Sequence, residues 1–160
     1  VSPTGAAGDT TRPRSGNRIN NTRSWLVGRC LPAMHAAEIN AAAKVAAARP
    51  DVDAARITAR AEGIPGLWLL LAAAGGGPFS EVRLDRTPHS YRSAIETSVH
   101  TNLHDAVIPG FALKWHIDDL RQLAGPQRVR WKNPTDWMGN IARVSGSFHY
   151  TSTDPNVGGK

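Results

Sequence analysis

Two histidines in the middle of the chain have the spacing of a helical metal-ligand pair. His100 and His104 are four residues apart, so on a helix both imidazoles would lie on one face. Together with His116 or Asp105 they could hold Zn²⁺ and leave one position open for water. Thr101 stands where the metalloprotease helix motif has a glutamate, so the pair does not match that motif. The alternative interpretation is that both histidines are surface residues beside an apolar stripe.

A single cysteine offers a second kind of chemistry. Cys30 precedes a predicted helix, where the helix dipole and Arg29 would favour its thiolate. A Cys–His hydrolase would then take its base from His89, His100 or His116. In the alternative interpretation Cys30 is a small packed hydrophobe. As the only cysteine, it excludes an intramolecular disulfide and a Cys-rich zinc site.

Basic and aromatic residues interleave near the C-terminal end, at Arg128, Arg130, Trp131, Lys132 and Trp137. Proteins that hold single-stranded nucleic acid combine aromatic stacking with basic contacts to phosphates in this way. A strand with buried tryptophans and solvated charges would give the same pattern. The short sequences 89–91 (His-Ser-Tyr) and 149–150 (His-Tyr) also permit an acid–base nuclease, provided that the fold brings such groups together.

The positive charge is concentrated towards the two ends. The 160-residue chain has a formal net charge of +6. Residues 1–30 and residues 121–144 each contain five basic residues and one aspartate, whereas residues 31–120 contain eight basic and ten acidic residues. This asymmetry indicates contact with an anionic partner: nucleic acid, an anionic lipid surface or an acidic protein subunit.

The elements that must position these residues are mostly helical. Apolar periodicity, alanine content and Gly/Pro breaks predict helices over 31–49, 51–62, 93–107 and 111–123, a core segment at 67–71 and a short strand over 79–84. The expected fold is a mainly α small domain of three to five helices with irregular or short-β arms. We expect a basic arm over 1–24, disordered by itself, a helical body over 25–125 and a basic, aromatic arm over 126–160.

Several classes of protein are excluded. The longest apolar run, Leu67 to Ala74, is too short to cross a membrane, so no transmembrane segment is expected. The chain has no glycine-rich phosphate loop, no dinucleotide fingerprint and no G-x-S-x-G nucleophile elbow. No cofactor is therefore expected, apart from zinc in the metal-dependent alternative.

Several short segments of the sequence resemble the iron–sulfur-protein-4 accessory subunit of mitochondrial respiratory complex I. They are residues 15–16 (Ser-Gly), 20–25 (Asn-Asn-Thr-Arg-Ser-Trp), 130–134 (Arg-Trp-Lys-Asn-Pro), 138–139 (Met-Gly) and 151–158 (Thr-Ser-Thr-Asp-Pro-Asn-Val-Gly). In the family the segments that correspond to 130–134, 138–139 and 151–158 are continuous, and the long stretch between residues 25 and 130 is absent. The family also ends in an aromatic, alanine-rich segment that is missing here. The resemblance implies a non-catalytic, matrix-facing subunit that binds no cluster and wraps its neighbours with extended arms.

The sequence therefore predicts a non-catalytic accessory or structural subunit of a large assembly, mitochondrial by the resemblance. A respiratory complex and an organellar ribosome both fit, so the partners are protein subunits, with RNA or an anionic lipid as alternatives. The predicted contact residues are Arg14, Arg18, Arg128, Arg130, Trp131 and Lys132. One alternative is a small basic hydrolase, a nuclease or a metal-dependent enzyme, using His100, His104 and His116. Another is a phage or viral structural protein.

Overall fold

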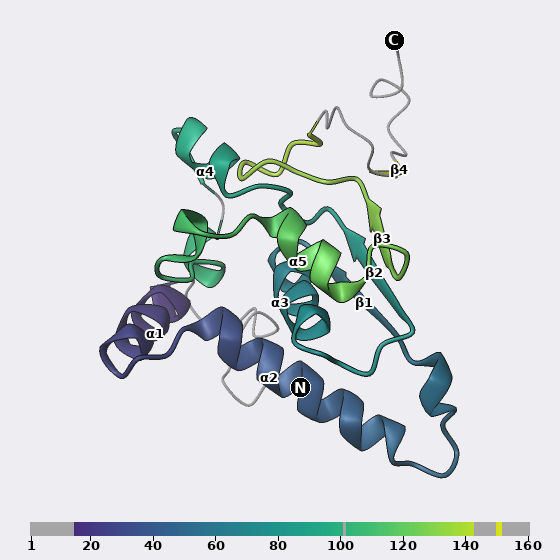
Figure 1. Cartoon of the computed structure of the whole chain (residues 1–160). Helices are drawn as coiled ribbons and strands as arrows, with labels where there is room; N and C mark the ends of the chain where they lie inside the picture. The colour runs from purple at the N-terminus through teal and green to yellow at the C-terminus, as the bar shows by residue number, and fades with distance from the viewer. Residues whose placement is uncertain (1–14, 101, 143–149, 152–160) are drawn as a thin grey trace.

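The computed structural model describes residues 15–100, 102–142 and 150–151. Along the chain these residues form α1 (Ser15–Leu26), α2 (Leu31–Ala47), η1 (Ala54–Arg56), β1 (Thr58–Glu62), α3 (Ile64–Ala74), β2 (Glu81–Asp85), α4 (Arg92–Glu96), η2 (Leu103–Asp105), η3 (Phe111–Leu113), α5 (Ile117–Ala124), β3 (Val129–Lys132) and β4 (Tyr150–Thr151). Figure 1 shows the helices gathered on one side of a small sheet. The fold is mixed α/β, which corrects the expectation of a mainly α domain.

The sheet is parallel, with the strand order β1-β2-β3-β4. Helix α3 connects β1 to β2, and the segment that contains α4 and α5 connects β2 to β3. Within the described part of the chain, helices cover one face of the sheet and leave the other open (Figure 1). The strands show this asymmetry directly, because Val82, Leu84 and Trp131 are buried while the residues between them are exposed.

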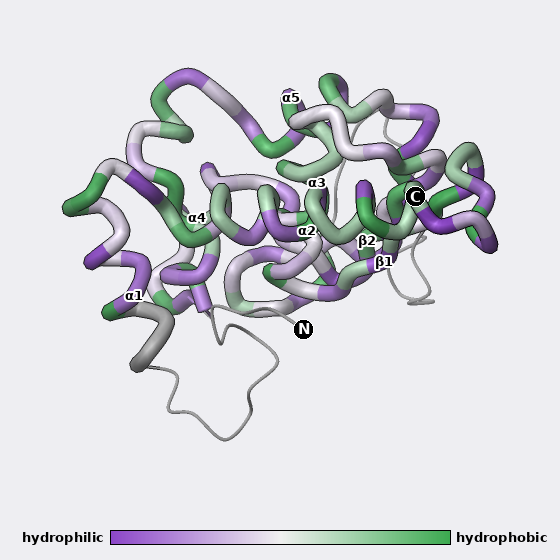
Figure 2. Tube along the Cα trace, turned by 90° about the horizontal axis from the view of Figure 1, so that it is seen from below, coloured by the Kyte–Doolittle hydropathy of each residue, from purple (hydrophilic) through white to green (hydrophobic). Residues whose placement is uncertain are grey.

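The predicted core segment forms the centre of the molecule. Residues 67–70 of α3 are all buried, and Leu70 is fully enclosed. Helix α3 packs on β1 and β2, while α2 and α5 pack on α3. The hydropathy colouring of Figure 2 shows α3 as a mainly apolar helix between these neighbours. Gly66 permits the close approach, since a Cβ there would lie 1.9 Å from the Thr87 hydroxyl oxygen.

The N-terminal region contains more structure than its composition predicted. Residues 15–24 belong to α1 instead of a disordered arm. The buried side chain of Asn21 donates to the His104 carbonyl at 2.6 Å and accepts from the Leu31 N–H at 2.9 Å. These bonds connect α1 both to the start of α2 and to the segment around η2. A buried, satisfied amide therefore holds a helix whose polar sequence has little apolar surface to bury.

Two predicted helices are wrong. The segment 51–62 forms η1 and the edge strand β1, because its alternating alanines, Ala59 and Ala61, pack towards the core while β1 pairs with β2. The segment 93–107 ends its helix at Glu96 and continues as a loop and η2. Ile95 and Val99, expected on a buried stripe, are 82% and 63% exposed. The helices over 31–49 and 111–123 correspond to α2 and to η3 with α5, and the strand over 79–84 corresponds to β2.

Residues 126–142 contribute to the core and do not form a separate arm. Strand β3 lies between β2 and β4, and Val129, Trp131 and Trp137 belong to the same apolar cluster as α3. The loop after β3 is fixed to the loop after β2 by backbone bonds between Thr135 and Thr87 and between His89 and Thr135. The remaining residues of the predicted C-terminal arm, 143–149 and 152–160, lie outside the described residues, as do residues 1–14 of the predicted N-terminal arm.

Candidate functional site: a charged sheet face and an apolar end

The open face of the sheet carries a row of three arginines. The parallel register pairs Arg60 with Arg83 and Arg83 with Arg130, one residue on each of three adjacent strands. Their side chains are 70%, 59% and 70% exposed. We call this row, with the charged residues two positions before and after it, the arginine face. Its other charged members are Glu62, Glu81, Asp85, Arg128 and Lys132.

The row is only partly neutralised by carboxylates. Glu81 accepts a hydrogen bond from the Arg83 guanidinium at 2.8 Å and lies 3.6 Å from that of Arg130. The Arg83 hydrogen bond, with the charge of Arg130, lowers the pKa of Glu81, so this carboxylate stays charged in mildly acidic solution. Asp85 lies 3.8 Å from the Arg60 guanidinium, beyond hydrogen-bond distance. Three guanidinium groups thus face two carboxylates, and most of each arginine side chain remains in contact with solvent.

The predicted contact residues of β3 and its flank lie on different faces of the sheet. Arg128 and Arg130 are exposed on the arginine face, and Lys132 is half-buried at its edge. Trp131 has the opposite orientation and is only 2% exposed, so its indole cannot stack on a base. This corrects its place among the predicted contacts. Arg18 lies in α1, and Arg14 lies outside the described residues.

The three predicted metal ligands lie on separate local structures. His100 follows α4 and its ring contacts the Ala94 carbonyl, His104 lies in η2, and His116 is the N-cap of α5. All three are exposed. The helix that would have aligned His100 with His104 ends before either residue. Among the described residues, no three His, Cys, Asp or Glu side chains form a group that could hold a metal ion.

The residues of the acid–base interpretation are bound to the backbone. The ring of His89 lies 2.9 Å (Nδ1) from the Thr135 carbonyl, and the Tyr91 hydroxyl donates to the Ala106 carbonyl at 2.5 Å. Burial raises the pKa of Tyr91. Ser90 accepts from Trp137 through its carbonyl, at 2.6 Å. These bonds give His89 and Tyr91 a structural role at the junction of two loops; His149 lies outside the described residues.

The turn from β1 into α3 has a shape that sequence motifs did not reveal. Gly63 joins the strand to the helix with φ 66° and ψ −141°, and a Cβ built there would meet no atom within 4 Å. A sharp strand-to-helix turn at the end of a parallel strand is the geometry in which a nucleophile elbow presents a serine. Here the position is a glycine, so the turn offers no nucleophilic side chain. The feature that identifies this turn is the positive φ of Gly63, and the sequence does not show a backbone angle.

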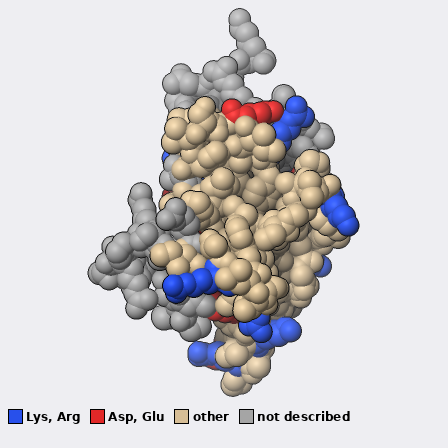
Figure 3. All heavy atoms as spheres, turned by 90° about the vertical axis from the view of Figure 1, so that its left-hand side faces the viewer, with Lys and Arg blue, Asp and Glu red and all other residues tan. Residues whose placement is uncertain are grey.

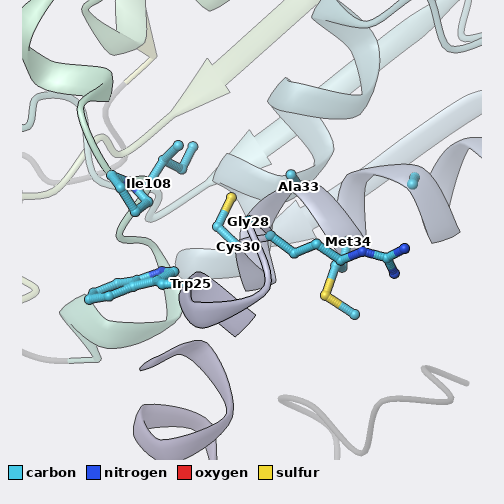
Figure 4. A pocket seen from close by; sticks show the side chains of 9 residues that line it. Trp25, Gly28, Cys30, Ala33, Met34 and Ile108 are labelled. Carbon is cyan, nitrogen blue, oxygen red and sulfur yellow. The ribbon is translucent and has the colours of Figure 1, made fainter. Parts of the chain in front are cut away.

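Cys30 is the N-cap of α2, as its position predicted, and it lines an apolar pocket of about 610 Å³. Figure 4 shows this pocket between the end of α1, the first turn of α2 and the segment around Ile108. Its other lining residues are Trp25, Gly28, Arg29, Ala33, Met34, Ala37 and Pro109. Among the residues that the structure describes, no histidine and no acidic residue lines this pocket, so none of them is placed there as a base for Cys30.

Large apolar side chains are exposed around this pocket and towards α4. We call this region the apolar end; it comprises α1 with residue 27, α4 with the residues that follow it up to 100, and the turns over residues 103–115, at the left of Figure 1. Figure 3 views the molecule from that side and shows a central area of uncharged residues, with Lys, Arg, Asp and Glu side chains towards its margins. The exposed side chains are Leu26 (84%), Val27 (72%), Ile95 (82%), Val99 (63%), Leu113 (87%) and Trp115 (46%). Apolar surface gathered in this way is typical of interaction sites.

Two further findings concern the whole described chain. No described helix is long and apolar enough to cross a membrane. Comparisons of the chain with protein-family models, with curated proteins and with solved structures find no match.

Proposed function

We propose that this protein is a non-catalytic accessory subunit of a larger protein assembly, bound to its neighbours through the apolar end. The observation that carries the proposal is the exposure of Leu26, Ile95 and Leu113 at the apolar end, each of which is more than four-fifths exposed. Burying such side chains against a partner contributes roughly 25 cal/mol for each Å² of apolar surface removed from water. The neighbouring pocket beside Trp25 provides a concave site for an apolar side chain of the partner.

The geometry of the candidate catalytic residues supports the non-catalytic part of the proposal. The strand-to-helix turn carries Gly63 where a hydrolase would carry a nucleophile. His89 and Tyr91 hold loops together, and His100, His104 and His116 lie on separate structures. In its finer form the proposal places the assembly in mitochondria, and this rests on the resemblance to the complex I accessory subunit.

The test is the size of the native protein in an extract of the cells that produce it. We expect the chain to elute from a sizing column far above its 17.2 kDa mass. The combined substitutions Leu26→Glu, Ile95→Glu and Leu113→Glu should release it as a monomer. These residues are exposed, so the circular dichroism spectrum of the purified variant should be unchanged.

The matched control is Val45→Glu. Val45 is an exposed apolar residue, 69% accessible, near the C-terminal end of α2 and outside the apolar end. This variant should stay in the assembly. A wild-type chain that elutes as a monomer, or a triple variant that still elutes in the large species, would contradict the proposal.

A further inference from the structure

The arginine face is a second surface, with a chemistry different from that of the apolar end. Its central row holds Arg60, Arg83 and Arg130 side by side on three strands. Neighbouring strands of a sheet are about 4.8 Å apart, so the outer two arginines start about 10 Å from each other. All three side chains extend from the same face, because they occupy the same register position and alternate along their strands with residues that pack towards the core.

The face has an unsatisfied surplus of positive charge. Its five basic residues, Arg60, Arg83, Arg128, Arg130 and Lys132, outnumber the three carboxylates of Glu62, Glu81 and Asp85. Each guanidinium has five N–H donors, and only Arg83 is hydrogen-bonded to a carboxylate of the face at short distance, 2.8 Å. Each arginine of the row lies within 4 Å of one carboxylate of the face, and its remaining exposed N–H donors are accessible to additional carboxylates of a partner.

The acidic residues beside the row and the burial of Trp131 favour a protein over a nucleic acid as the partner of the arginine face. The carboxylates of Glu81 and Asp85 lie immediately beside the arginine row, where they would repel a continuous line of phosphates. The one aromatic side chain of β3, Trp131, is buried on the opposite face, so the strand offers no ring for a base to stack on. A protein surface can place single carboxylates opposite the arginines and leave neutral or basic groups opposite the acids.

We propose that the arginine face docks an acidic α-helix of a partner protein, lying across the strands with one carboxylate opposite each arginine. Residues i, i+4 and i+7 of a helix advance by about 6 and 10.5 Å, which matches the spacing of the row. Bidentate pairing of carboxylates with guanidinium groups gives this docking its specificity. The inference deepens the proposed function and rests on it for a biological partner, but its chemistry is testable by itself.

The probe is an alanine-based helical peptide of 22 residues with glutamates at i, i+4, i+7 and i+11, labelled with a fluorophore. Its anisotropy with the full-length protein is compared with that of the same peptide carrying glutamines and with that of a labelled 20-nucleotide uridine RNA. We expect the glutamate peptide to bind at least ten-fold more tightly than the glutamine peptide and the RNA. Combining Arg60→Gln, Arg83→Gln and Arg130→Gln should weaken its binding at least ten-fold.

The matched control removes three arginines elsewhere, by Arg49→Gln, Arg56→Gln and Arg92→Gln. Each of these residues is exposed and pairs with a carboxylate outside the arginine face, at 2.6, 2.7 and 2.9 Å. The control variant has the same net charge as the test variant and should bind the glutamate peptide like the wild type. An equal loss of peptide affinity in both variants would mean that only the net charge of the protein matters, and it would overturn the inference. RNA that binds more tightly than the peptide, and depends on the arginine row, would instead assign the face to nucleic acid.

The fate of the native assembly separates the two proposals. If the arginine-row variant fails to bind the peptide while the apolar-end variant alone leaves the assembly, both proposals stand with distinct surfaces. If the peptide binds the wild type and the arginine-row variant equally, the inference fails although the wild type still elutes in the large species. If the wild type elutes as a monomer, the proposed function fails, and the peptide measurement still decides the chemistry of the face.

Discussion

Asn21 is the residue on which the position of α1 depends most directly. Its amide donates to the carbonyls of His104 and Val107, at 2.6 and 3.3 Å, and its oxygen accepts from the Leu31 N–H at 2.9 Å. Three backbone groups of two distant segments are therefore satisfied by one side chain that is 2% exposed. The sequence showed only an asparagine in a polar segment, because which carbonyls it meets is decided by the folded chain.

Asn21→Ala should destabilise the protein by roughly 3 kcal/mol, since it leaves the buried Leu31 N–H and the partly buried carbonyls of His104 and Val107 without this partner. The measurement is urea denaturation followed by circular dichroism. Asn20→Ala is the control, because Asn20 is the exposed neighbour on the same helix and should change the free energy of unfolding by less than about 0.5 kcal/mol. Similar losses in both variants would mean that helix propensity, and not the Asn21 hydrogen bonds, fixes α1.

Asp136 organises the turn that follows β3. Burial opposes its ionisation, but hydrogen bonds from the Asn140 side chain and from the Met138 and Asn140 backbone outweigh it and lower the pKa of Asp136. A carboxylate whose pKa is lower in the folded protein stabilises the fold above its unfolded pKa of about 3.9. That stabilisation is lost as the pH falls through the lower, folded value.

Asp136→Ala should therefore lower the free energy of unfolding by about 1 kcal/mol at pH 7. The difference in the free energy of unfolding between variant and wild type should decrease between about pH 5 and pH 2, as the wild-type carboxylate becomes protonated. Urea titrations at pH 7 and near pH 2.5 measure both values. A gap that stays constant over this range would show that the charge of Asp136 does not contribute.

At the scale of elements, α3 determines the core because it packs against the sheet and two helices. Its sequence has apolar residues at nearly every position, as expected for a helix that is covered on several sides. Trp68 adds a directional contact, since its indole N–H donates to the Asp105 carbonyl at 2.8 Å and its ring stacks on His35 at 4.1 Å. Helix α3 therefore joins the sheet, α2 and the loop around η2.

Leu70→Ala should cost roughly 3 kcal/mol of stability, because Leu70 is fully buried and its truncation leaves a cavity that the packed neighbours fill only partly. Leu123→Ala in α5 makes the same chemical change at a position that is 61% exposed, and it should cost less than about 0.5 kcal/mol. Guanidinium denaturation of both variants provides the comparison. Equal costs would contradict the packing of α3 described above.

The elements also show where local sequence was sufficient. Helix α2 was predicted nearly to its ends, since Pro32 suits the first turn and Pro50 follows the last. Strand β1 was mistaken for a helix, because its short, alanine-rich sequence is locally compatible with one. Its pairing with β2, whose residues lie more than twenty positions later in the chain, overrides that preference.

At the scale of the whole molecule, β3 and the loop that follows it complete the core. Val129, Trp131 and Trp137 contribute to the same buried cluster as α3 and α5. A body that ends at residue 125 would therefore expose apolar surface of β2 and α5 that β3 and its following loop cover in the full chain. Folding of the helices is coupled to the formation of the parallel sheet.

A chain truncated after residue 125 should lose its cooperative thermal transition, whereas one truncated after residue 151 should retain it. Far-UV circular dichroism melts of the two purified proteins measure this difference. The second chain keeps every described strand and serves as the control. A sharp transition in the shorter chain would show that residues 15–125 fold without β3.

The molecule presents its two interaction surfaces in different ways. The apolar end collects exposed Leu, Ile and Val side chains from separate turns, while the arginine face arises from regular strand register. Binding at the apolar end should depend weakly on ionic strength, and binding at the arginine face should weaken with salt, because exposed ion pairs are screened. The affinity of the glutamate peptide for the arginine face, measured at 50 and 300 mM salt, checks the second expectation. Binding that is equally tight at both salt concentrations would contradict it.

The sequence by itself determined α2, the apolar segment of α3, the position of β2 and the basic character of residues 128–132. These features depend on apolar periodicity, helix propensity and Gly/Pro breaks, all of which act between near neighbours in the chain. Only the tertiary structure decided that Trp131 faces the core, that Gly63 adopts a positive φ, and that Arg60 and Arg83 join Arg130 in one row. Parallel pairing brings together residues that are distant in sequence, so no local pattern encodes which side chains will share a face.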